Sequence, residues 1–410
     1  MSTLSRFGTS VTDIVSDLRR DGSGWVLLFV SLGWFLSLGV RIVYPALLPQ
    51  VTAEFGVSHA TTGLFIGVLW TTYALFQFPG GALADAVGER VVLSGSVLFT
   101  ILGVGALALS TTLPLFVLAT ILLGFSTGLY GTTRITVLSA VYDRMETTAI
   151  SVSQASGNVG NVVLPATAGF VSVYLGWRGG FGVLVPLLLL SAAGLWLFVP
   201  RRAATATAEA SFTQTMSKVA AAIRSPRVLA VTLLLSLNMF LYQSVTGFLP
   251  TYLTDVKGLA PSTAASLFSL FFATAIGIQF LSGAVADRFG NRVAITAFLG
   301  LSVPAFVLLT VAETFLALVG VIVLLSCMLG GMPAANAAGV SALPEEIQGS
   351  GFGLLRTGYI AFGAIGPLVV GQLADYGRFD GAFLLLGGVA LAMSAWGAVF
   401  QRFGEGPSDQ

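Results

Sequence analysis

Long apolar runs separated by short polar segments recur along the whole chain. We identify twelve such runs, near residues 24–49, 59–83, 91–110, 114–138, 148–174, 180–199, 227–253, 262–285, 292–311, 315–338, 349–373 and 381–400. A helix needs about 20 apolar residues to cross the hydrocarbon core of a bilayer. The pattern therefore predicts an all-α membrane protein with twelve transmembrane helices.

The longest polar break divides these runs into two sets of six. It predicts a cytoplasmic N-terminal segment over 1–23, a first six-helix bundle over 24–199 and a cytoplasmic linker over 200–226. A second six-helix bundle over 227–400 and a cytoplasmic tail over 401–410 complete the expected organisation.

The composition agrees with a lipid environment and excludes several classes of protein. The chain is 55% hydrophobic and 9% charged, with a mean hydropathy of +0.91, too apolar for a water-soluble surface. Its net charge of +1 provides no basic surface for nucleic acid. Cys327 and His59 are the only residues of their types, which argues against a disulfide or a metal cluster. We therefore predict no enzymatic activity, no cofactor, no metal and no nucleic-acid partner.

Positive charges are unevenly distributed between the two sets of predicted loops. When the N-terminus, the central linker and every second loop are assigned to the cytoplasm, that side carries thirteen cations and the other side three. The thirteen are Arg6, Arg19, Arg20, Arg90, Arg144, Arg201, Arg202, Lys218, Arg224, Arg227, Arg288, Arg292 and Arg402; the three are Arg178, Lys257 and Arg378. Cytoplasmic loops carry an excess of Lys and Arg. We expect a multi-pass protein of the cell membrane with both termini in the cytoplasm.

A sequence repeat relates the two halves. Residues 80–93 read GGALADAVGERVVL, and residues 282–295 read SGAVADRFGNRVAI. Four identities share an offset of 202 positions: Gly81, Asp85, Gly88 and Arg90 match Gly283, Asp287, Gly290 and Arg292. Repeated halves are typical of transporters, which bind substrate near mid-membrane between the halves.

The repeated segment resembles the G-x-L-a-D-r-x-G-r motif of the major facilitator superfamily. In that family the motif lies between helices 2 and 3 and again between helices 8 and 9, so the resemblance implies two pseudo-symmetric six-helix bundles. The first copy departs at Ala86, where the family has a basic residue that Arg288 retains in the second. Because interfaces of this kind can switch between two states, we predict that the eight matched residues form a gating motif. The alternative is an ion pair that only stabilises a short turn.

Three cations fall inside predicted spans, whereas all 18 acidic residues can be placed in loops, tails or helix ends. They are Arg41, Arg134 and Arg356. An Arg at the centre of a spanning helix costs about 2.5–3.5 kcal/mol on insertion scales. Arg41 lies deepest among apolar neighbours, so we predict that it contacts substrate rather than extending to the membrane surface. Arg134 and Arg356 lie nearer helix ends, and Arg356 could equally be a surface anchor or a gate residue.

The same 202-residue offset pairs polar residues within the spans. Arg41 corresponds to Gln243, Arg134 to Asn336, Gln77 to Gln279 and Gln154 to Arg356. Lipid-facing positions have no reason to keep such a correspondence. Intramembrane polar groups face the bundle interior or water, so the pairs indicate a central cavity. The predicted substrate-binding residues are Arg41, Tyr44, Gln77, Arg134, Tyr242, Gln243, Gln279, Asn336, Arg356 and Tyr359. For each uncharged member, helix packing or an interface anchor is the alternative.

Unpaired guanidiniums around one cavity favour a negatively charged cargo, because Arg forms paired hydrogen bonds with carboxylate or phosphate. Residues 40–58 and 63–85 also resemble the start of the anion:cation symporter group of the superfamily. That group carries an Arg in helix 1 and another in helix 4, where Arg41 and Arg134 stand, and moves organic anions such as sugar acids. It often has acids within the membrane for proton coupling, and this sequence places none there.

We therefore predict a monomeric secondary transporter that moves a small organic anion, a carboxylate or a sugar acid, by alternating access. A symported proton or sodium ion, an exchanged anion or facilitated diffusion remain open as driving modes. The alternatives are a drug or metabolite efflux transporter of the same superfamily and an inorganic-anion exchanger.

Overall fold

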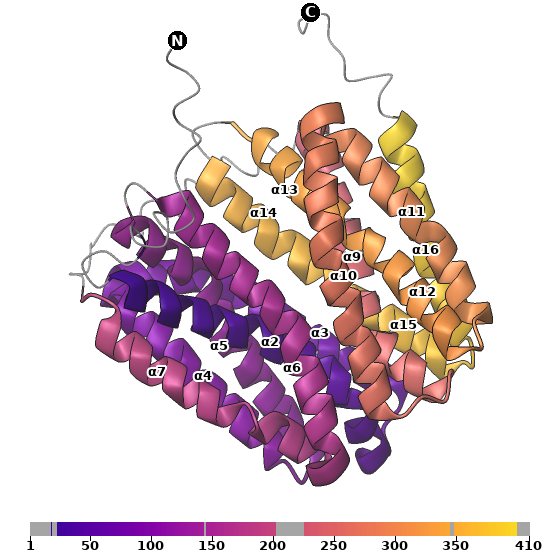
Figure 1. Ribbon diagram of the computed structural model, residues 1–410, viewed down its shortest axis with the longest axis horizontal. Helices are drawn as coiled ribbons and strands as arrows, with labels where there is room; N and C mark the ends of the chain where they lie inside the picture. Colours follow the sequence, from indigo (N-terminus) through magenta and orange to yellow (C-terminus); the bar gives the residue numbers. More distant parts are fainter. Residues whose placement is uncertain (1–17, 19–22, 143–144, 202–224, 345–347, 400–410) are drawn as a thin grey trace, which may run out of the picture.

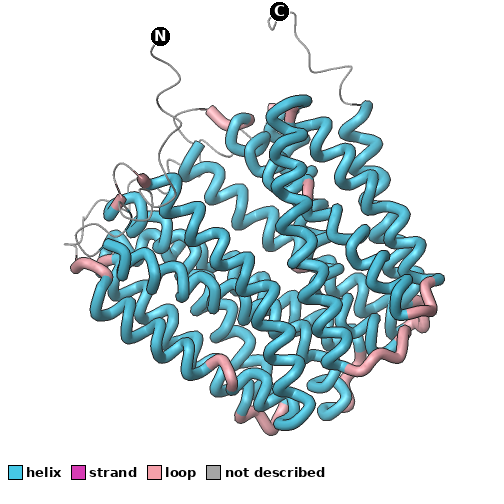
Figure 2. Tube along the Cα trace, viewed as in Figure 1, coloured by secondary structure: helices cyan, strands magenta, loops and turns pink. Residues whose placement is uncertain are grey.

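The computed structural model describes residues 18, 23–142, 145–201, 225–344 and 348–399. These residues form helices joined by short turns, and they contain no strand (Figure 2). Most of the predicted N-terminal segment 1–23, linker 200–226 and tail 401–410 lies outside the described residues.

The helices of the first half are α2 (Ser23–Phe55), α3 (His59–Val87), α4 (Glu89–Ala108), α5 (Leu113–Val141), α6 (Glu146–Gly182) and α7 (Val185–Phe198). Those of the second half are α9 (Pro226–Asp255), α10 (Pro261–Phe289), α11 (Asn291–Val311), α12 (Phe315–Leu325), the 3-10 helix η2 (Ser326–Leu329), α13 (Gly331–Ser341), α14 (Gln348–Gly363), α15 (Ile365–Asp375) and α16 (Phe379–Val399). Local signals set several of these ends. A proline occupies the first turn of α5, α7, α9 and α10, where its missing N–H has no helical acceptor.

Ten helical segments of the described chain are long and apolar enough to cross a membrane. One of them, Glu146–Phe198, contains both α6 and α7. The remaining passage is α3, whose 29 residues include threonines, Gln77 and Tyr73 among apolar neighbours. Each of the twelve predicted runs thus corresponds to helical structure, and α3 lies outside the ten segments.

Three predicted runs are not continuous helices. The run 180–199 contains the end of α6, a turn at residues 183–184 and α7. The run 315–338 consists of α12, η2 and α13, and the run 349–373 is divided into α14 and α15 at Ala364. Apolarity predicts a membrane passage but not whether its backbone is regular, which explains why the interruptions were missed. Broken helices are common at binding sites of transporters, and the interruptions in 315–338 and 349–373 lie in the second half, which also lines the cavity described below.

The two halves lie side by side, with α2–α7 in indigo to magenta and α9–α16 in orange to yellow (Figure 1). Across their interface α3 packs against α14 and α15, α6 against α10, and α2 against α9. Glycine makes the closest approaches possible. A Cβ added at Gly63 would lie 2.4 Å from the Pro367 carbonyl oxygen, and one at Gly169 would lie 2.5 Å from the Ala265 Cβ.

One end of the interface carries polar contacts between the halves. Asp375, which ends α15, accepts hydrogen bonds from the backbone N–H groups of His59 at 2.8 Å and Ala60 at 3.0 Å. The His59 Nε2 lies 3.9 Å from the Asp255 carboxylate, and its ring lies 5.3 Å from the Phe379 ring. We call this the His59 end. Asp375 therefore supplies an anionic cap to the N-terminus of α3 from the opposite half.

The repeated motif forms the same turn in both halves. Gly88 joins α3 to α4 with φ 86°, and Gly290 joins α10 to α11 with φ 89°. Both values lie in the region that favours glycine, so the repeat preserves a backbone geometry. The Arg90 guanidinium lies 4.6 Å from the Trp196 ring, and Asp287 is exposed. The side chain of Asp85 lies outside the described set, and the gating role of the motif stays a prediction.

Candidate functional site

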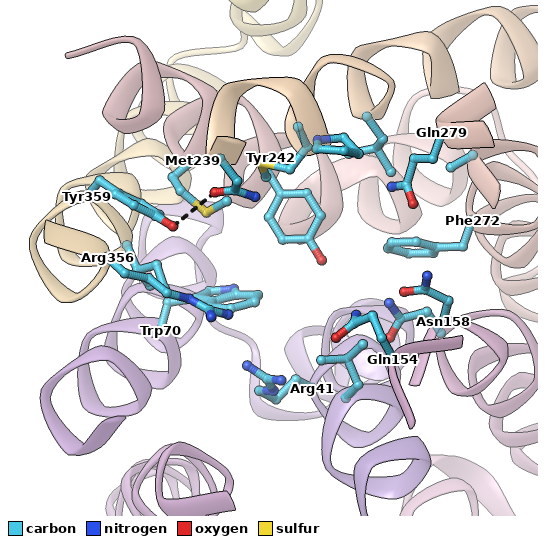
Figure 3. A pocket seen from close by; sticks show the side chains of 18 of the residues that line it. Arg41, Trp70, Gln154, Asn158, Met239, Tyr242, Phe272, Gln279, Arg356 and Tyr359 are labelled. Atoms are coloured by element: carbon cyan, nitrogen blue, oxygen red, sulfur yellow. Dashed lines mark hydrogen bonds between the residues drawn. The ribbon is translucent and has the colours of Figure 1, made fainter. Parts of the chain in front are cut away.

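A cavity of about 510 Å³ lies between the two halves (Figure 3). The first half contributes Leu38 and Arg41 from α2, Trp70 and Tyr73 from α3, and Gln154, Asn158 and Asn161 from α6. The second half contributes Met239 and Tyr242 from α9, Phe272, Ala275, Ile276 and Gln279 from α10, Leu329 from η2, Met332, Pro333 and Asn336 from α13, and Phe352, Arg356, Tyr359 and Ile360 from α14. This volume suits a small molecule.

Arg41 points into this cavity and carries a charge that no described carboxylate neutralises. Its side chain is 2% exposed, its Nε donates to the Ser37 carbonyl at 3.1 Å, and its buried Nη2 has no hydrogen-bond partner. The guanidinium carbon lies 3.8 Å from the centre of the Tyr73 ring and 5.4 Å from that of Trp70. Aromatic faces stabilise the cation in part, but they leave Nη2 without a hydrogen-bond partner.

Arg134 lies one layer behind the cavity wall. It is 4% exposed, and its two terminal nitrogens donate to the Ser153 hydroxyl at 3.1 Å and to the Gln154 Oε1 at 2.7 Å. The Arg134 guanidinium carbon lies 4.1 Å from the centre of the Trp34 ring. The Arg41 guanidinium carbon lies 5.8 Å from the centre of the same ring. Arg134 does not line the cavity in this structure, and it reaches the lining through Gln154.

The wall of the second half carries the other charge and several hydrogen-bonding groups. Arg356 lines the cavity from α14, and Tyr359, one turn further along, donates to the Asn336 Oδ1 at 3.3 Å. Tyr242 meets Trp70 of the first half edge to face, with ring centres 5.8 Å apart. Figure 3 shows Arg356 and Tyr359 at one side of the cavity and Gln279 at the other.

Besides Arg134, three of the sequence-predicted residues lie outside the lining and pack between helices in this structure. The Tyr44 hydroxyl is 2.7 Å from that of Thr120, and the Tyr44 ring packs on Phe116 in the core. Gln77 is 3% exposed and buried beside α5. The Gln243 Nε2 donates to the Ile360 carbonyl at 2.9 Å, which joins α9 to α14.

The predicted binding residues left out much of the first-half wall, although the 202-residue offset had already paired Gln154 with Arg356. Gln154, Asn158 and Asn161 follow one another at spacings of four and three residues, which places them on one face of α6. That spacing was a signal that could have identified them. Trp70 and Tyr73 gave no such signal, because aromatic residues are common throughout the spans.

No group of His, Cys, Asp or Glu in the part of the chain that the structure describes could hold a metal ion. The cavity lining contains hydrogen-bonding amides, tyrosines and two arginines, but no carboxylate. The arrangement is suited to binding a polar anion.

The family model described as Major Facilitator Superfamily matches residues 28–327 and again residues 257–407. A Salmonella paratyphi B protein named for multidrug resistance, MdtD, is 29% identical over 182 residues, which cover 44% of this chain and 38% of that protein. A Chlamydia muridarum protein named for hexose phosphate transport is 29% identical over 157 residues, which cover 38% of this chain and 34% of that protein. The matches therefore span well under half the length of these relatives.

Solved structures share the fold over nearly the whole chain. A POT family transporter in complex with 5-aminolevulinic acid superposes with a TM-score of 0.78 at 13% identity, covering 94% of this chain and 98% of that one. The nucleoside transporter NupG gives a TM-score of 0.75 at 14% identity, covering 92% and 99%. A bacterial homologue of the lysosomal transporter Spinster, inward-facing and unoccupied, gives 0.72 at 16% identity, covering 92% and 95%. At these identities the likeness concerns the fold alone.

Proposed function

Because this chain belongs to the Major Facilitator Superfamily, and is therefore a multi-pass membrane transporter and not an enzyme, we propose that it carries a small organic anion by alternating access. The cargo class is a carboxylate or a sugar acid, and Arg41 binds its charged end. Arg134 supports the same site from behind Gln154, and Arg356 faces it from the other half. We further propose that the protein works as a monomer in the cell membrane with both termini in the cytoplasm.

The observation that carries this proposal is the unneutralised guanidinium of Arg41. It is buried in the membrane interior with a free donor nitrogen, and the lining contains no carboxylate. A buried charge without a partner is strongly unfavourable, so its retention is best explained by a ligand that neutralises it. The Chlamydia relative, named for the transport of an anion, supports the same class of cargo.

The rest of the lining supports a cargo with hydroxyl groups. Asn158, Gln279 and Tyr242 line the cavity without any described side-chain hydrogen bond, and they can bond the uncharged part of a polar molecule. Apolar walls from Phe272 and Met239 lie beside them. An anion with a compact polar body fits this mixture.

The lining also bears on the driving mode. Proton symport through a buried acid requires an Asp or Glu near the cargo, and no residue of the lining has one. Four driving modes remain: a proton carried on the substrate, exchange for a second anion, facilitated diffusion, or symport of sodium bound by backbone carbonyls.

The test is uptake into proteoliposomes across monocarboxylates, dicarboxylates, sugar acids, phosphate and nitrate, with and without gradients of pH, sodium and voltage. Arg41→Ala is expected to abolish uptake of anions. Arg378→Ala, which removes an exposed guanidinium at the α15–α16 turn, serves as the control and is expected to leave uptake unchanged. Uptake of neutral sugars that no anion inhibits would overturn the proposal.

A drug or metabolite exporter is the second candidate. The Salmonella relative is named for multidrug resistance, and Phe272, Phe352, Met239 and Met332 give the cavity an apolar wall of the kind that binds varied molecules. Export of neutral or cationic drugs that persists in Arg41→Ala would favour this candidate. Export that requires Arg41 and acts only on anionic compounds would favour the organic-anion carrier.

A further inference from the structure

We propose that Gln154 determines the specificity of the cavity for an acceptor-only group, because Arg134 holds its amide with the N–H₂ toward the cargo. The inference rests on the proposed function, an anion carrier. It assigns to Arg134 a positioning role, which it exerts through Gln154.

The orientation of the Gln154 amide follows from the chemistry of its partner. A guanidinium has only donors, so the atom 2.7 Å from the Arg134 terminal nitrogen must be the amide oxygen. This assignment needs no choice between alternative amide flips. With its oxygen directed at Arg134, Gln154 has its N–H₂ group free for the cargo, and no described residue hydrogen-bonds to that nitrogen.

Arg134 is itself held in place by its surroundings. It donates to Ser153 at 3.1 Å and stacks on Trp34 at 4.1 Å, and both it and Trp34 are at least 96% buried. Trp34 is confined in turn, since a Cβ at Gly157 would lie 2.4 Å from its ring. Rotation of the Gln154 amide would place its N–H₂ against the guanidinium, two donors facing each other.

The Arg41 guanidinium, which also lines the cavity, has only hydrogen-bond donors. Arg41 lines the cavity from the same half as Gln154, and its buried Nη2 has no hydrogen-bond partner. A carboxylate can accept from both, because it has only acceptors. A carboxamide that spans the two donors in the same way places its own N–H₂ against one of them, and it avoids this only by accepting both bonds at its single oxygen. The cavity should therefore prefer ligand groups that accept hydrogen bonds over groups that donate them, in addition to preferring anionic ligands over neutral ones.

Gln279 provides the matched comparison within the same cavity. It is also a lining glutamine, but no described residue bonds to its side chain. Its amide is free to rotate and can present either the oxygen or the nitrogen. Loss of Gln279 should weaken binding generally without changing the preference between acceptor and donor ligands.

The experiment measures binding of benzoate, methyl benzoate and benzamide to the full-length protein in nanodiscs by calorimetry. The two neutral probes separate hydrogen-bond polarity from charge, because the ester offers only acceptors and the amide offers a donor. The wild type is expected to bind benzoate best and to prefer the ester over the amide. Gln154→Leu should weaken benzoate binding about tenfold, the size of one hydrogen bond to a charged group, and remove the preference between the neutral probes.

The sharpest variant is Gln154→Glu, which keeps the shape and changes the remaining atom from donor to acceptor. Its carboxylate will bond Arg134 through one oxygen and present the other to the cavity, so the preference should invert toward benzamide. Arg134→Met should release the Gln154 amide and reduce the ester preference, and Arg134→Lys, which keeps a donor, should restore it. A merely structural role for Arg134 would lower affinity for all three probes equally.

The outcomes distinguish this inference from the proposed function. Failure of the wild type to prefer benzoate over methyl benzoate would overturn the anion carrier itself. An ester preference that is absent in the wild type, or that persists unchanged in Gln154→Glu, would overturn the role of Gln154 and leave the anion site intact. Gln279→Leu should retain the ester preference, and its loss there would also count against the inference.

Discussion

Replacing Arg41 with methionine should abolish anion transport without lowering the stability of the protein. Methionine is unbranched and flexible, so it can occupy the path of the arginine stem along Tyr73 and Trp70. It removes the charge and the free Nη2 donor. A buried polar residue can bind cargo or stabilise the packing of helices, and the prediction separates these roles. If Arg41 were retained for packing, Arg41→Met would lower stability.

The magnitude follows from the contacts of Arg41. Removing an arginine from the membrane interior relieves about 2.5–3.5 kcal/mol on insertion scales. The variant loses cation–π contacts with Tyr73 at 3.8 Å and Trp70 at 5.4 Å, together worth about 1–2 kcal/mol. It also loses the bond from Nε to the Ser37 carbonyl, worth about 1 kcal/mol. We expect the free energy of unfolding of Arg41→Met to equal that of the wild type or to exceed it by up to about 1.5 kcal/mol.

Thermal unfolding in nanodiscs measures the stability, and proteoliposome uptake measures the transport. Arg378→Met is the control, because that arginine is exposed at the α15–α16 turn and neither measurement should change. The reasoning would be refuted if Arg41→Met unfolded well below the wild type, or if it transported anions at the normal rate. Addition of a transported anion should raise the melting temperature of the wild type and leave that of Arg41→Met unchanged.

Three further predictions concern the frame around the cavity. Asp375→Ala removes the anionic cap on α3 from the opposite half and should make the cavity more accessible from the His59 end, as measured by labelling of a cysteine introduced into the lining. Unchanged labelling would show that the cap does not hold that end together. Gly290→Ala should lower stability by about 1–2 kcal/mol, because φ is 89° there, whereas Gly283→Ala, in open space, should be neutral. Equal melting temperatures for the two variants would contradict this. Gly63→Ala should lower stability by about 1–3 kcal/mol, since the added Cβ would lie 2.4 Å from the Pro367 carbonyl; a wild-type melting temperature would indicate that α3 and α15 separate easily.

The membrane frame of this protein could be predicted from sequence because lipid imposes a constraint along the chain. Every passage must be apolar for about 20 residues and must satisfy its own backbone hydrogen bonds as a helix. Apolar runs therefore identified the passages, and the 202-residue offset identified two matching glycine turns, Gly88 and Gly290. The interruptions at η2 and at Ala364 could not be predicted, because apolarity reports the solvent of a segment and not the regularity of its backbone.

The cavity was predicted less completely, and the reason is geometric. A polar residue in a span can face a cavity or a neighbouring helix, and the sequence does not specify the rotation of one helix against another. Gln279 and Gln243 illustrate this: the first lines the cavity, and the second bonds the backbone of α14. Tyr44 lies one turn from Arg41 on α2, yet it packs in the core against Phe116.

The sequence by itself determined that the chain spans a membrane, that its halves repeat, and that its interior holds arginines without acids. These are properties of composition and spacing, which the solvent selects residue by residue. Only the tertiary structure decided which arginine meets the cargo space: Arg41 enters it, while Arg134 is placed behind Gln154 by a bond of 2.7 Å between α5 and α6. That difference arises from the packing of helices against one another, where a small rotation decides which neighbour a side chain meets.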